Sequence, residues 1–219
     1  MRFYLIRHGA TRGNREQRYV GCTDEGILEE EIDKMRKKGQ SFPSMDGIFL
    51  SPYLRCKQSA YALFSIFQYQ DYKRLNQKKE LNHIFQTKGK IEVVEDFREM
   101  DFGIFEYKNY QELNGNTDYQ KFIDSAGKTG FPEGESLQKF QFRCQESFLK
   151  CVEKAKENEW ETVAFVVHGG TIMAILEAFG YPKKEYYDYQ VSNGCGYILQ
   201  LEEKNKEKYI SLRIEEEIK

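Results

Sequence analysis

Apolar residues along the chain gather in short unbroken runs that are separated by longer stretches with a helical period. Residues 3–6 (Phe-Tyr-Leu-Ile) and 162–167 (Thr-Val-Ala-Phe-Val-Val) are the clearest of these runs. Such runs are typical of strands that are buried on both faces of a parallel sheet. Shorter runs at residues 47–50 and 91–94 predict two further strands.

The stretches between these runs predict helices. Ser51, which a proline follows, and Ser136 are the residue type that caps helix N-termini. The apolar period predicts helices at residues 25–38, 51–67, 136–158 and 170–179. Residues 195–201 and 208–214 predict a β-hairpin. Alternating strands and helices indicate a single α/β domain over residues 1–219, a three-layer α/β/α sandwich around a mostly parallel sheet.

Each of the two clearest apolar runs ends in a histidine that a glycine follows. The first run continues to His8 and the second to His168. Ligands bind beyond the carboxyl ends of the strands in open α/β sheets. We therefore expect these two of the three histidines to meet in an active site. A small polar excursion near residues 104–130 is expected to lie over that site, whereas His83, in the polar segment 68–90, is expected to be exposed.

Two arginines and one glutamate complete the candidate chemistry. Arg7 lies at the end of the first predicted strand, and Arg55 lies in the first turn of the helix that follows Ser51. Arginine suits phosphate oxygens because its planar fork donates several hydrogen bonds. Histidine can attack a phosphoryl group and form a covalent intermediate. Glu99, just after a predicted strand, is the candidate acid for the leaving oxygen.

Composition narrows the class of partner. The formal net charge is −2, with basic and acidic residues mixed along the chain. This mixture argues against binding to nucleic acid or to anionic membranes. No apolar run approaches the roughly 20 residues of a membrane span. The five cysteines are scattered, with no Cys-x-x-Cys pair. They predict free thiols, no metal site and a cytoplasmic protein. The expected partner is a small molecule, and whether the protein forms a homodimer stays open.

Four motifs, in this order along nearly the whole chain, resemble those of the histidine phosphatase superfamily, in the branch that includes the cofactor-dependent phosphoglycerate mutases. The motifs are residues 5–11 (L-I-R-H-G-A-T), 51–60 (S-P-Y-L-R-C-K-Q-S-A), 99–103 (E-M-D-F-G) and 167–171 (V-H-G-G-T). The resemblance implies a phosphoglycerate mutase-like fold and an enzyme that needs neither metal nor cofactor. Ala10 departs from the pattern, because many members have Glu or Gln there.

Residue by residue, the resemblance implies that His8 becomes a phosphohistidine and that Glu99 donates the proton to the leaving group. The residues that it implies as phosphoryl- or substrate-binding are Arg7, Asn14, Gly21, Thr23, Arg55, His168 and Gly169.

Three shorter stretches are similar to the α-ribazole phosphatases of cobalamin assembly. They are residues 18–25, 100–106 and 131–136. This similarity implies a phosphomonoesterase acting on α-ribazole 5′-phosphate, whose flat base would lie against Tyr19, Phe102, Phe105 and Tyr107. A broad-specificity phosphatase and a phosphoglycerate mutase are the alternatives within the superfamily. A non-catalytic phosphoester-binding module is the alternative of another class.

Overall fold

The computed structural model describes residues 1–64, 90–125, 127, 129–203 and 210–219. Its centre is a sheet of seven described strands in the order β3-β2-β4-β1-β6-β7-β5. The strands are β1 (Arg2–Arg7), β2 (Gly47–Leu50), β3 (Lys90–Val93), β4 (Thr162–Val167), β5 (Gly180–Tyr181), β6 (Gly196–Glu203) and β7 (Ile210–Ile218). Of these seven, β6 runs antiparallel to its two neighbours and the remaining pairs are parallel. The predicted mostly parallel sheet is confirmed.

Strand β1 lies at the middle of the sheet because both of its faces are apolar. Phe3 and Leu5 belong to the core on one face, whereas Tyr4 and Ile6 belong to the core on the other. Strand β4 pairs with β1 in parallel and in register, so that Arg7 is opposite Val167. The two strands therefore end side by side, and the residues that follow them emerge together.

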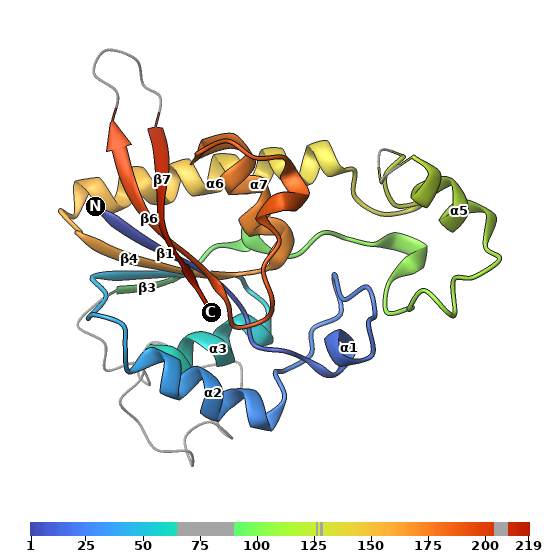
Figure 1. The fold of residues 1–219 in the computed structure, drawn as a ribbon, viewed down its shortest axis with the longest axis horizontal. Coiled ribbons are helices and arrows are strands. Elements are labelled where there is room, and N and C mark those ends of the chain that lie inside the picture. Colours follow the sequence, from blue (N-terminus) through green and yellow to red (C-terminus); the bar gives the residue numbers. More distant parts are fainter. Residues whose placement is uncertain (65–89, 126, 128, 204–209) are drawn as a thin grey trace.

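Helices cover both faces of the sheet (Figure 1). Helices α2 (Glu29–Gly39) and α3 (Leu54–Phe64) pack on one face. Helices α6 (Leu137–Glu157) and α7 (Gly169–Phe179) pack on the other. The predicted three-layer sandwich is confirmed. No helix among the described residues is long and apolar enough to cross a membrane.

Two predicted helix starts are wrong. Helix α2 begins at Glu29 rather than at residue 25, because Ile27 forms a β-bridge with Thr11 and holds the chain extended there. Helix α3 begins at Leu54, and Ser51 is not its N-cap. The Leu54 N–H instead donates to Asp24 Oδ1 at 2.7 Å.

The other predicted elements agree with the structure. Ser136 caps α6, since its hydroxyl accepts the Lys139 N–H at 3.3 Å. The C-terminal hairpin is confirmed by the antiparallel pairing of β6 with β7. Residues 68–89 of the polar segment, including His83, and the end of the predicted helix at residues 65–67 lie outside the described part of the chain.

The described residues of the excursion near residues 104–130 form mainly turns and two short helices. They are η3 (Gly103–Phe105) and α5 (Thr117–Asp124), which Asn116 caps. Figure 1 shows α5 standing apart from the four helices that cover the sheet. The excursion contributes Phe122 and Gly130 to the cavity described below.

Candidate active site

His8 and His168 meet beyond the ends of β1 and β4, as predicted. Their ring centroids are 5.1 Å apart, with the rings nearly perpendicular. The His8 N–H donates to the Val167 carbonyl at 3.0 Å, so the parallel pairing continues one residue past the strand. The register of the sheet therefore places both imidazoles at one site.

The His8 imidazole is held in one tautomer. Its Nδ1 lies 2.8 Å from the Gly9 carbonyl oxygen, and a carbonyl can only accept, so Nδ1 carries the proton. The lone pair is then on Nε2, the atom a nucleophile needs. Burial, followed by the charges of Arg55 and Arg7, lowers the pKa of His8 well below its ordinary value. The imidazole is neutral at physiological pH.

Arg7 presents an unsatisfied donor beside His8. Its Nη1 donates to the Val191 carbonyl at 2.7 Å. Its Nε is buried and has no hydrogen-bond partner among the described residues. Buried donors are rarely left without a partner, so this nitrogen suits an incoming anion. A Cβ on Gly169 would lie 3.4 Å from Nε, so Gly169 packs against the guanidinium.

Arg55 is fully buried, and each of its three guanidinium nitrogens donates to the protein; direct binding of a phosphoryl group by Arg55 stays a prediction. Nη1 donates to the Thr23 carbonyl at 2.7 Å, and Nη2 donates to the Gly21 carbonyl at 2.9 Å. Nε donates to His168 Nδ1 at 3.4 Å, and the group stacks on Tyr53. Arg55 thus ties the 21–23 loop to the second histidine, while its positive charge remains beside His8.

The Gly21 and Thr23 backbone is held by Glu106 and Arg55. The N–H groups of Gly21 and Thr23 donate to Glu106 Oε1 at 3.0 and 2.9 Å, and neither residue lines the cavity around His8. The structure brings both residues to Arg55. Direct binding of substrate by Gly21, Thr23 or Gly169 stays a prediction.

His168 is buried behind His8 rather than in the cavity wall. Because its Nδ1 accepts from Arg55, its Nε2 carries the proton and donates to Ser51 Oγ at 2.6 Å. The Ser51 hydroxyl also accepts the Tyr53 N–H at 3.4 Å, before the helix begins at Leu54. Burial, Arg55 and the other histidine lower the pKa of His168 well below its ordinary value. Its direct contact with a phosphoryl group stays a prediction.

Asn14 lines the cavity with its amide oriented by two bonds. Its Oδ1 accepts the Thr11 N–H at 3.2 Å and the Asn193 Nδ2 at 3.0 Å. The oxygen is thus used within the protein, and the amide nitrogen is the end suited to a phosphate oxygen. Asn193, which also donates to the His8 carbonyl at 3.2 Å, was missed by the sequence reasoning. An Asn-Gly turn alone does not reveal such a role.

Glu99 lies in the same cavity as His8. One carboxylate oxygen accepts the Met100 N–H at 2.9 Å. Burial raises the pKa of Glu99, although this backbone bond and the charges of Arg55 and Arg7 oppose the rise. A Cβ on Gly170 would lie 2.7 Å from Glu99 Oε1, so the glycine lets the carboxylate approach the start of α7. A carboxyl group with a raised pKa suits a general acid.

The cavity has a volume of about 410 Å³, and its lining residues form two chemically unlike groups. We call the polar group, which consists of Arg7, His8, Asn14 and Glu99, the phosphate end. The second group, which we call the aromatic wall, consists of Tyr19, Phe102, Phe122, Phe131, Tyr186 and Tyr187. The expected contributions of Tyr19 and Phe102 are confirmed.

The expected contributions of Phe105 and Tyr107 to this wall are wrong. Phe105 is fully buried and packs behind Tyr19 and Phe131. The Tyr107 hydroxyl donates to Glu25 at 3.2 Å, outside the cavity. The sequence reasoning did not assign the other four aromatic residues to the wall. Phe131 lies in the 131–136 motif, whereas Phe122, Tyr186 and Tyr187 come from segments that meet the others only in the folded chain.

Arg18 is the second cation among the described cavity residues, and it is neutralised. Its Nε lies 2.6 Å from Glu16 and its Nη1 lies 2.6 Å from Glu112. Nη1 also donates to the Tyr107 carbonyl at 2.6 Å. The aromatic wall therefore lacks a free positive charge among these residues for a second anionic group on a ligand.

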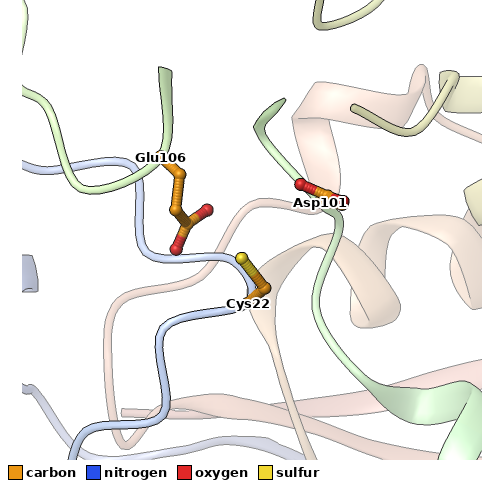
Figure 2. A group of neighbouring side chains, drawn as sticks. All are labelled: Cys22, Asp101 and Glu106. Atoms are coloured by element: carbon orange, nitrogen blue, oxygen red, sulfur yellow. The ribbon is translucent and has the colours of Figure 1, made fainter. Parts of the chain in front are cut away.

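One group of side chains in the described chain places potential metal-ligand atoms close together. The relevant atoms of Cys22, Asp101 and Glu106 all lie within 4.8 Å of one another (Figure 2). The Glu106 carboxylate accepts the N–H groups of Gly21 and Thr23 and so holds the 21–23 loop. Asp101 Oδ1 accepts the Gly103 N–H at 2.9 Å. These bonds give both carboxylates a structural role, and we assign no metal to the group.

Comparison with known proteins agrees with this geometry. The sequence matches the family model of the histidine phosphatase superfamily (branch 1) over residues 3–84 and 79–210. No curated protein matches it. The fold is similar to an α-ribazole phosphatase from Shigella flexneri, with a TM-score of 0.73, 21% identity, and coverage of 98% of this chain and 95% of that one. It is also similar to a phosphoglycerate mutase from Thermus thermophilus, with a TM-score of 0.65, 22% identity, and coverage of 100% and 99%.

Proposed function

Because the chain belongs to the histidine phosphatase superfamily (branch 1), we propose that it hydrolyses phosphate monoesters through a phosphohistidine at His8. Membership supports an enzyme of the phosphatase or mutase type. The observation that carries the proposal is the bond from His8 Nδ1 to the Gly9 carbonyl. It leaves the Nε2 lone pair of a neutral imidazole as the nucleophile in a cavity that also contains Arg7 and Glu99.

In the first step, His8 Nε2 attacks phosphorus, and the bond from phosphorus to the ester oxygen breaks. The protonated carboxyl group of Glu99 gives its proton to that oxygen, so the alcohol leaves neutral. In the second step, Glu99 removes a proton from water as the water oxygen attacks phosphorus. The bond from phosphorus to Nε2 then breaks, inorganic phosphate leaves, and Glu99 is protonated again.

Fixed positive charge supplies most of the stabilisation. Phosphoryl transfer has a loose transition state with charge on the equatorial oxygens. The unpartnered Nε of Arg7 and the amide nitrogen of Asn14 are suited to donate to those oxygens. Buried Arg55 adds a positive potential beside the nucleophile, and neutral His168 accepts its Nε–H. Because these groups are held before substrate binds, little reorganisation is needed during the reaction.

The aromatic wall favours a phosphate ester of a flat, uncharged alcohol. We place α-ribazole 5′-phosphate first, which would put the enzyme in cobalamin biosynthesis. A structural neighbour that carries this activity in its name supports the choice, as does the neutralised Arg18. A phosphoglycerate would need a free cation for its carboxylate. The free thiol state of all five cysteines fits a cytoplasmic enzyme of small-molecule metabolism.

A side-by-side screen of phosphate monoesters tests the proposal. Purified protein is incubated with α-ribazole 5′-phosphate, 3-phosphoglycerate or p-nitrophenyl phosphate, with and without a chelator, and phosphate release is measured. We expect kcat/KM for α-ribazole phosphate to exceed that for 3-phosphoglycerate by at least about 100-fold, or about 2.7 kcal/mol, with no effect of chelator.

Each alternative predicts a different result of the same screen. A flat profile over the esters would indicate a broad-specificity phosphatase. Isomerisation of 3-phosphoglycerate without phosphate release would indicate a mutase. Binding of the esters with neither turnover nor protein phosphorylation would indicate a binding module.

A further inference from the structure

The carbonyl that orients His8 belongs to a peptide group whose other end is also bound. The Gly9 carbonyl accepts from His8 Nδ1 at 2.8 Å. The N–H of the same peptide group, that of Ala10, donates to Glu31 Oε2 at 3.2 Å. The Glu31 carboxylate is therefore connected to the His8 ring through one peptide group, that between Gly9 and Ala10.

Glu31 is built into the structure at this point. It lies in the first turn of α2 and is only 8% exposed. Its other oxygen, Oε1, pairs with Lys34 at 2.6 Å, so both carboxylate oxygens are used. The Ala10 carbonyl accepts the Leu28 N–H at 2.8 Å. Residues 28–31 therefore hold Ala10 through both its N–H and its carbonyl group.

The neighbouring peptide group is held as well. The Gly9 N–H donates to the buried Ser59 Oγ at 2.9 Å. A Cβ on Gly9 would lie 3.0 Å from Met35 Sδ and 3.3 Å from the Glu31 Cβ, so α2 packs closely on this loop. The position of Glu31 relative to the Gly9–Ala10 peptide is thus fixed by packing as well as by the hydrogen bond.

We infer that Glu31 is a positioning residue for His8. This inference rests on the proposed function, in which His8 is the nucleophile. The bond to Glu31 fixes the rotation of the Gly9–Ala10 peptide, so its carbonyl points at Nδ1. An oxygen that accepts the Ala10 N–H also polarises the amide and makes its carbonyl a stronger acceptor. Both effects keep the proton on Nδ1 and the lone pair on Nε2.

The competing explanation gives Glu31 a purely structural role. An acidic residue in the first turn stabilises the helix dipole, and the pair with Lys34 adds a small local contribution. These roles need a negative charge near the start of α2, but they do not need an oxygen at Ala10. Substitutions of Glu31 can remove its charge and shorten its side chain separately.

Three variants make the separation. Glu31→Gln keeps the length and an oxygen that can accept the Ala10 N–H, but loses the charge. Glu31→Asp keeps the charge but is one methylene shorter. Glu31→Met keeps the length and loses both. Asp33→Asn is the matched control, because Asp33 is an exposed acid of the same helix that pairs with Arg36. Thermal unfolding establishes which variants are folded.

The readouts are the rapid-quench rate of His8 phosphorylation, KM, and the ¹⁵N NMR signals of the His8 ring. We expect Glu31→Gln to stay within about threefold of the wild type. Glu31→Asp and Glu31→Met should phosphorylate about 10- to 100-fold more slowly with little change in KM, since small misplacements cost up to about 100-fold. Their ring signals should show loss of the single Nδ1–H tautomer.

Two results would overturn the inference: folded Glu31→Asp as fast as the wild type, or Glu31→Gln as slow as Glu31→Met. If Glu31→Met does not fold, the Asp and Gln variants decide the question between them. The NMR readout needs no turnover. A wild-type protein without phosphatase activity would therefore contradict the proposed function, whereas an unchanged tautomer in Glu31→Asp would contradict the positioning role.

Discussion

The phosphate end of the cavity begins where β1 ends, whereas the aromatic wall comes from loops and short helices outside the sheet. His8 follows β1, and a buried hydrogen bond fixes its imidazole. Phe122 lies on α5, and Tyr187, on η4 (Tyr186–Tyr189), is 56% exposed. Rigid placement suits the chemical step, which needs preorganised charge, whereas an apolar wall needs only area and shape. Damage to the first end should therefore lower kcat, and damage to the second should raise KM.

The largest effect is expected from His8→Ala. Removal of the nucleophile should lower turnover by at least about 10⁴-fold on every ester. The fold should persist because β1 is held by the packing of Phe3, Leu5 and Ile6 on the two cores. Initial rates with thermal unfolding as the control check this prediction. More than a few per cent of wild-type activity in the folded variant would rule out covalent catalysis by His8.

Glu99→Gln should distinguish between leaving groups. An alkyl phosphate needs protonation of its leaving oxygen, so its phosphorylation step should slow by about 10²- to 10⁴-fold. Nitrophenolate leaves without a proton, so p-nitrophenyl phosphate should phosphorylate His8 at close to the wild-type rate. The burst phase in rapid-quench experiments measures this step. Equal losses on both substrates would move the acid role to another residue, with Asp101 the first to examine.

The pH profile should reflect the two opposite pKa shifts at the phosphate end. Neutral His8 is the reactive form, and its pKa is lowered by burial and the nearby arginines. Activity should therefore persist as the pH falls below about 6.5, the ordinary histidine value. The pKa of Glu99 is raised by burial, so its acid form should persist above about 4.3. Activity on an alkyl phosphate should then fall as the pH rises through that raised pKa.

The measurement for this prediction is kcat/KM against pH, with the titration of the substrate divided out. The wild type should lose activity about tenfold per pH unit on the alkaline side with an alkyl phosphate. This decrease in activity at alkaline pH should be small with p-nitrophenyl phosphate. An acidic limb centred at or above the ordinary histidine pKa would contradict the neutral nucleophile.

The smallest effect is expected at the aromatic wall. Phe122→Ala removes one ring of the wall, and aromatic contacts contribute about 0.5–1.5 kcal/mol beyond buried area. KM for α-ribazole phosphate should rise about 3- to 10-fold with kcat nearly unchanged. Ile123→Ala is the control, since Ile123 is the next residue of α5, is 50% exposed and does not line the cavity. A loss in kcat instead of KM would mean that the two ends are not independent.

The two ends also differ in how far the sequence predicts them. His8 and His168 follow apolar runs, and parallel pairing places such strand ends together, so local patterns were sufficient. The residues that contact the two histidines were harder to predict from the sequence. Ser51 has the residue type of a helix cap, but its hydroxyl binds His168. Glu31 has the pattern of an exposed helix residue until α2 is packed against the loop at Ala10.

The aromatic wall was predicted only where its residues lie close to a recognised motif. Tyr19 and Phe102 belong to such stretches, and both line the cavity. Phe122, Tyr186 and Tyr187 come from parts of the chain with no shared period, and their meeting depends on the path of the excursion and of η4. Tertiary packing decides this, and a one-dimensional pattern does not contain it.

The most direct test of the central claim is the identity of the phosphorylated atom. Wild-type protein is quenched in alkali during turnover, and the phosphohistidine is identified by ³¹P NMR and by mass spectrometry of the peptide that contains His8. The bond from Nδ1 to the Gly9 carbonyl predicts phosphate on Nε2 of His8, and on no other residue. Phosphate on Nδ1, on another side chain, or on none during active turnover would contradict the mechanism.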